Sequence, residues 1–144
     1  MKKIIFAVAL LCALPLFADE KSNRIADLNA SKDAATIINA ADWLGKNGDE
    51  DAVQPLVNLL TDSRKDVRLH AVMALGNLGK EKGAAGVNSR ILNDPSSDVR
   101  YAAVLASFRI ASPSSLVIWQ QANEKETDPF IKDIFTKLTD KFKK

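Results

Sequence analysis

Residues 66–79 read Asp66-Val67-Arg68-Leu69-His70-Ala71-Val72-Met73-Ala74-Leu75-Gly76-Asn77-Leu78-Gly79, and the outline of this run returns in residues 98–111. A shift of 32 positions carries Asp66-Val67-Arg68 onto Asp98-Val99-Arg100. The apolar positions recur at helical spacing, and Gly79 is a typical helix end. Recurrence at a fixed spacing of this length indicates a stacked array of supersecondary units. The sequence therefore predicts an all-α repeat.

Helical patterns flank these two units on both sides. Apolar residues at helical spacing, interrupted by Gly or Pro, predict about four antiparallel helix pairs, at about residues 22–46, 51–79, 82–111 and 113–142. The last helix has an apolar arc, formed by Phe130, Ile131, Ile134, Phe135, Leu138 and Phe142. One buried face and one hydrated face suit the final unit of a stack. Residues 19–144 are expected to form one domain.

The N-terminus has the three parts of a secretory signal peptide. Met1-Lys2-Lys3 is basic, Ile4–Leu14 is a short apolar run, and Ala18 is a small residue at a suitable cleavage site. We expect cleavage after Ala18, so that residues 1–18 are the signal peptide and the mature chain is exported to the periplasm or cell envelope. The apolar run is shorter than the roughly 20 residues of a membrane-spanning helix. No stable membrane insertion is therefore expected after cleavage.

Cys12 is the only cysteine, and it raises the possibility of a lipoprotein. The residue before it, Leu11, is bulkier than the small residue expected just before such a cleavage site, which argues against acylation. Cleavage after Ala18 would leave no cysteine, and hence no disulfide or thiol catalysis.

Charge and composition exclude further classes. The chain has 20 basic and 18 acidic side chains, and removal of Lys2 and Lys3 leaves the two signs equal. Nucleic-acid binding depends on an excess of Lys and Arg, so no nucleic-acid partner is expected. A hydrophobic fraction of 47% with 26% charged residues is typical of a soluble globular chain.

The run from Asp66 to Gly79, with Ala71, Ala74 and Leu75-Gly76 at its centre, resembles the second helix of a HEAT repeat. The short form of that repeat is also found in phycobilisome-lyase-type HEAT-like proteins, and the chain looks like a bacterial exported member. The resemblance implies a right-handed α-solenoid, or alpha-alpha superhelix. It also implies a ladder between neighbouring units in which Asp66 and Arg68, and likewise Asp98 and Arg100, form ion pairs. The alternative is that these are solvated charges, because exposed ion pairs contribute little.

In this family the second helices line the inner face of the solenoid. Several residues expected on that face are more apolar than an idle solvent-facing surface, and we predict that they form a groove: Leu69, Met73, Tyr101, Leu105, Phe108 and Arg109. An exposed apolar and aromatic strip is a mark of an interaction site. The alternative is a tightly curved stack that buries these side chains. Trp43 and Trp119 are expected to fill the core.

No catalytic residue, cofactor or metal site is predicted. HEAT-like hydroxylases hold two irons with His-Glu pairs directly after the Val-Arg of the second helix, whereas this chain has Leu69-His70 and Tyr101-Ala102 there. A single histidine cannot supply the several converging ligands of a metal site. No phosphate-binding loop or nucleophile turn is recognisable either.

The sequence thus favours a non-catalytic scaffold module of the bacterial envelope, with an unidentified protein or peptide as partner. Two alternatives stay open. The first is a carrier of a small molecule or lipid, or a lyase-like HEAT protein, that uses the same groove. The second is a structural subunit of a larger envelope assembly.

Overall fold

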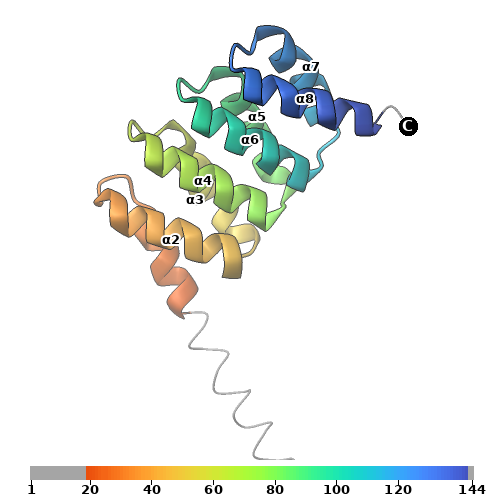
Figure 1. The fold of residues 1–144 in the computed structure, drawn as a ribbon. Helices are drawn as coiled ribbons and strands as arrows, with labels where there is room; N and C mark the ends of the chain where they lie inside the picture. The colour runs from red at the N-terminus through yellow and green to blue at the C-terminus, as the bar shows by residue number, and fades with distance from the viewer. Residues whose placement is uncertain (1–18, 143–144) are drawn as a thin grey trace, which may run out of the picture.

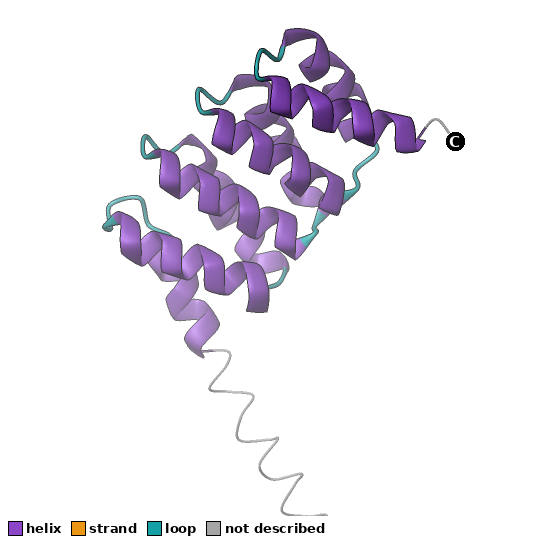
Figure 2. Ribbon diagram, viewed as in Figure 1, coloured by secondary structure: helices purple, strands orange, loops and turns teal. Residues whose placement is uncertain are grey.

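A computed structural model describes residues 19–142, and every regular element in this range is helical (Figure 2). The expected signal peptide, with Cys12, lies outside the described residues. A first helix covers residues 19–27. The others are α2 (Ala34–Asn47), α3 (Val53–Asn58), α4 (Lys65–Leu78), α5 (Ala84–Asn93), α6 (Ser97–Ile110), α7 (Ser114–Lys125) and α8 (Pro129–Phe142). Short 3-10 turns at Glu50–Ala52, Leu59–Thr61 and Glu81–Gly83 flank α3 and α5.

The helices form two layers. The even-numbered helices α2, α4, α6 and α8 lie side by side in one layer, and α3, α5 and α7 lie behind them (Figure 1). Adjacent helices of the first layer pack directly on each other from α2 to α6. This arrangement confirms the predicted all-α solenoid of helix pairs. Within residues 19–142, no helix combines the length and hydrophobicity needed to cross a membrane.

The core lies between the two layers. The repeated apolar positions of α4 and α6 are buried there, namely Val67, Ala71, Val72, Ala74 and Leu75 in α4 and Val99, Ala103, Val104 and Ala106 in α6. Trp119 is also buried, as predicted, and its indole Nε1 donates to the hydroxyl oxygen of Ser107 at 2.8 Å. In the last helix Ile131 and Phe135 are buried, but Phe130 is 61% exposed. The expectation that Phe130 belongs to the buried arc was therefore wrong.

Glycines allow the first-layer helices to approach closely. A Cβ atom on Gly45 of α2 would lie 2.8 Å from the Cα of Ala74 in α4. A Cβ on Gly76 of α4 would lie 2.7 Å from the Cβ of Ala106 in α6. Atoms cannot approach so closely, so neither site accepts a side chain unless the helices move apart.

Arginines connect successive units through ion pairs, one buried and one partly buried. Arg68 donates from Nε and Nη2 to the carboxylate of Asp94 at 2.9 and 3.0 Å, and Arg100 donates in the same way to Glu126 at 2.8 and 2.9 Å. The Nη1 of each arginine also bonds carbonyl oxygens in the loop before its own helix. Such two-pronged bonds fix both distance and orientation. Because Asp94 and Glu126 are 32 positions apart, as are the arginines, the contact is itself a repeat.

The acidic partners differ from those predicted. Asp66 and Asp98 lie in the first turns of α4 and α6, whereas helical side chains such as Arg68 lean back toward the preceding loop. The guanidinium therefore meets the acid in the loop of the following unit. Asp66 lies 3.9 Å from Lys65 of its own helix, and Asp98 accepts an exposed bond of 3.0 Å from Lys65 of the preceding unit.

The first junction has a substitute arginine. Helix α2 has no arginine, and Lys46 in its last turn is its only basic residue. Arg64, from the loop before α4, donates to the carboxylate of Asp62 and to the carbonyl oxygens of Ala30 and Lys32 in the loop before α2. Every junction between successive described first-layer helices is thus bridged by a guanidinium.

Replacing Gly76 with alanine is expected to lower the free energy of unfolding by about 1–3 kcal/mol through overpacking, although alanine is the better helix former by about 1 kcal/mol. Gly86→Ala is the matched control, because its new Cβ would meet the Cδ1 of Leu60, the far end of a side chain, whereas at Gly76 it would meet the backbone Cα of Ala106. Urea denaturation of both variants tests this. Equal or greater stability of Gly76→Ala would contradict the close approach.

Acid is expected to weaken the last junction. The hydrogen bonds from Arg100, with backbone N–H groups of Asp128 and Thr127, outweigh burial and lower the pKa of Glu126 from 4.5 to about 2. A lowered folded pKa adds stability that is complete above the unfolded value and is lost as pH falls toward 2. The side chain of Glu126 is only 4% exposed, so the contribution is about 3 kcal/mol.

The measurement is urea denaturation at pH 7, 4 and 3. Glu126→Gln should be less stable than the parent at pH 7 and should lose less stability on acidification, while Glu124→Gln, an exposed neighbour, should behave like the parent. An unchanged acid dependence in Glu126→Gln would show that the ion pair does not carry the effect.

Candidate binding groove

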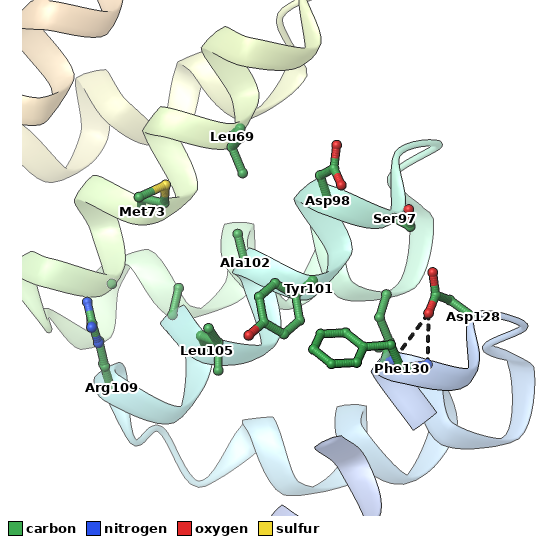
Figure 3. A pocket seen from close by; sticks show the side chains of 13 residues that line it. Leu69, Met73, Ser97, Asp98, Tyr101, Ala102, Leu105, Arg109, Asp128 and Phe130 are labelled. Carbon is green, nitrogen blue, oxygen red and sulfur yellow. Dashed lines mark hydrogen bonds between the residues drawn. The ribbon is translucent and has the colours of Figure 1, made fainter. Parts of the chain in front are cut away.

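A groove of about 500 Å³ runs over α6 between α4 and α8 (Figure 3). Helix α4 lines it with Leu69, Met73 and Gly76, and α8 contributes Phe130 and Ile131, with Asp128 just before that helix. Helix α6 contributes Ser97, Asp98, Tyr101, Ala102, Leu105, Ala106 and Arg109. The groove therefore lies on the layer of second helices, where the sequence placed it.

The groove is apolar and open. Met73 is 46% exposed, Leu105 40% and Phe130 61%, whereas Ile131 is buried beneath them. The rings of Tyr101 and Phe130 lie 5.4 Å apart across the junction of α6 and α8. Large apolar side chains therefore remain accessible on this face. The alternative, a tightly curved stack that buries these side chains, is therefore wrong for Met73 and Leu105.

Five of the six predicted groove residues are brought together: Leu69, Met73, Tyr101, Leu105 and Arg109. Sequence reasoning missed Phe130 and Ile131, because the last helix was treated only as a cap. The sequence did contain a signal for the position of Phe130, namely the capping residue Asp128 before Pro129. In the structure Asp128 caps α8 by accepting from the N–H groups of Phe130 and Ile131 at 2.9 and 3.3 Å. This cap sets Phe130 in the first turn, beside Tyr101.

Phe108 was wrongly assigned to the groove. Its ring stacks on Trp119 of α7, with centroids 6.3 Å apart and planes 27° apart, and it is not among the lining residues. Phe108 stands 32 positions after Gly76, at the point where the earlier junctions need glycine. Helix α8 packs less closely on α6 than α4 does. The groove thus opens where a large side chain replaces the glycine contact.

Charges of opposite sign mark the two ends of the groove. Arg109 lies at one end, where its Nη1 donates to Asn77. Asp98 and Asp128 lie at the other end (Figure 3). Between them the lining is almost entirely apolar. The arrangement suits an elongated ligand with an apolar side and ends of opposite charge.

The hydroxyl and carboxyl side chains that line the groove are Ser97, Asp98, Tyr101 and Asp128. His70 lies outside it, with Nδ1 2.7 Å from a carboxylate oxygen of Asp42 on α2. In the described part of the chain, no three His, Cys, Asp or Glu side chains are grouped closely enough to hold a metal ion. What the lining offers is apolar contact area with a few orienting charges.

Comparison with known proteins supports this architecture. A family model for HEAT repeats matches residues 23–108. This range includes α2 to α5 and most of α6, and so the α4 wall and nearly all of the floor of the groove. No curated protein matches the chain.

Phe108→Ala is expected to lower the free energy of unfolding by about 1–2 kcal/mol, because the ring loses its stacking on Trp119 together with part of its buried area. Intrinsic tryptophan fluorescence should change, and thermal denaturation measures the loss. Leu105→Ala is the matched control: it is similarly exposed but lies within the groove. A stable Phe108→Ala with unchanged fluorescence would contradict the stacking.

Proposed function

The chain belongs to the HEAT-repeat family, and we propose that it is a non-catalytic protein-binding module whose partner occupies the groove over α6. HEAT repeats generally mediate protein–protein interaction or scaffolding. The observation that carries the proposal is the groove itself, because it leaves Met73, Leu105 and Phe130 exposed in one continuous apolar surface. Contiguous exposed apolar surface favours association with another molecule.

We further propose that this module works in a bacterial envelope. The support is the pattern of residues 1–18, a basic start followed by Ile4–Leu14 and a small residue at Ala18. Residues 19–27, which follow the expected cleavage point, are helical.

A small apolar molecule is the second candidate ligand. The volume of about 500 Å³ falls in the range of small-molecule sites. Such sites usually enclose most of the ligand surface, whereas this groove has exposed walls at Met73 and Phe130. The open shape favours a macromolecular segment, which covers the groove from outside.

Affinity capture from envelope extract tests the proposal. The bait proteins are the parent, Tyr101→Glu in the floor of the groove, and Val117→Glu as the control, because Val117 is 57% exposed on α7 and outside the groove. A partner protein should be retained by the parent and by Val117→Glu and lost from Tyr101→Glu, because a buried unpaired carboxylate opposes binding.

Circular dichroism and thermal denaturation check that Tyr101→Glu is folded. If Tyr101→Glu is unstable, Met73→Glu on the α4 wall of the groove replaces it and should lose the same partner. Recovery of the same proteins by all the bait proteins would argue against the groove. Tight self-association of the parent, lost in Tyr101→Glu, would instead favour a structural subunit interface.

A further inference from the structure

We infer that the groove binds one short amphipathic helix, parallel to α6, with its N-terminus at Asp98 and Asp128 and an acidic side chain of its last turn on Arg109. This inference rests on the proposed function and specifies the partner's secondary structure, charge and direction. It follows from the shape of the groove, the chemistry of its floor and the charges at its ends.

The shape fits about three turns of helix. The floor residues of α6 recur every three or four positions, so the groove follows one face of that helix from Asp98 to Arg109. These residues are 11 positions apart, or about 16 Å at 1.5 Å per residue. Leu69 and Met73 form one wall, and Phe130 the other. An incoming helix would place apolar side chains at helical spacing between these walls.

The floor favours a helix over an extended peptide. It consists of side chains from helices whose backbone groups are bonded within those helices, and among residues 19–142 there is no strand edge to pair with. An extended peptide pressed onto Tyr101 and Leu105 would bury backbone N–H and C=O groups without partners, which is costly. A helix satisfies these groups internally and presents only side chains.

The end charges set the direction. At one end, Asp98 and Asp128 line the groove, Lys65 pairs with Asp98 and lies 3.9 Å from exposed Asp66, and the nearby Arg100 is paired with Glu126. Acid exceeds base there, which favours the positive end of a helix dipole or a basic first turn. At the other end, a guanidinium has five N–H donors, and the bond from Arg109 to Asn77 uses one of them. Arg109 can therefore bind a carboxylate in the last turn of the partner.

Two synthetic peptides provide the test. Both have 14 residues, the same composition, blocked termini and leucines along one helical face. One has two lysines in the first turn and two glutamates in the last, and the other has these reversed. The reversed peptide is the better helix in isolation. Tighter binding of the lysine-first peptide must therefore come from the protein.

Fluorescence anisotropy with the full-length protein at low salt should give the lysine-first peptide about tenfold tighter binding. Arg109→Gln and the double variant Asp98→Asn/Asp128→Asn should each reduce this preference, and asparagine at 128 preserves the cap of α8. Val117→Glu should leave both affinities unchanged.

Each outcome separates the two levels of the proposal. Equal binding of the two peptides, abolished by Tyr101→Glu, would overturn the inferred direction and leave the protein-binding groove intact. Tighter binding of the reversed peptide would likewise overturn the direction. No binding of either peptide at 100 µM would overturn the helix inference, while capture by the parent would still support the proposed function. Peptide binding that survives both Tyr101→Glu and Met73→Glu would count against the groove itself.

Discussion

The close approach of α2 to α4 and of α4 to α6 is the constraint on which the stack depends. At both junctions a glycine faces an alanine, so the axes come nearer than larger side chains would permit. Glycine inside a helix costs about 1 kcal/mol relative to alanine, and packing supplies the compensation. This contact fixes the first layer, and the guanidinium bridges then hold the loops of neighbouring units in register.

The same constraint explains where the regular stack ends. At the third junction Phe108 occupies the glycine position, and its ring stacks on Trp119 of α7 instead of facing α8. The indole N–H of Trp119 also donates to the hydroxyl of Ser107. The last unit is attached through these contacts and through Arg100 and Glu126 instead of through a close crossing of α6 and α8. The apolar side chains that a close crossing would have covered stay accessible as the groove.

The sequence predicted those features that depend on local periodicity. The 32-residue repeat predicted the helices and their buried faces. It also predicted one surface for five residues that line the groove in the structure. It could not identify the acids of the ladder, because Asp94 and Glu126 differ in type and act through loop geometry. It also misplaced Phe108, which shares a helical face with Tyr101 and Leu105. A helical wheel gives the angle of a side chain around its own axis, but not which neighbouring helix it meets.

The groove is limited to one half of the solenoid, and the reason lies in the first unit. On the corresponding face of α2, Asp42 pairs with His70 of α4, so a polar contact stands where the next junction has Met73 and Ala102. An apolar partner gains nothing by extending over that pair, because it would have to desolvate both groups. The open junction at Phe108 thus begins the apolar surface and the Asp42–His70 pair ends it. The inner face is therefore one bounded site between these two features, although the repeat that builds it is continuous.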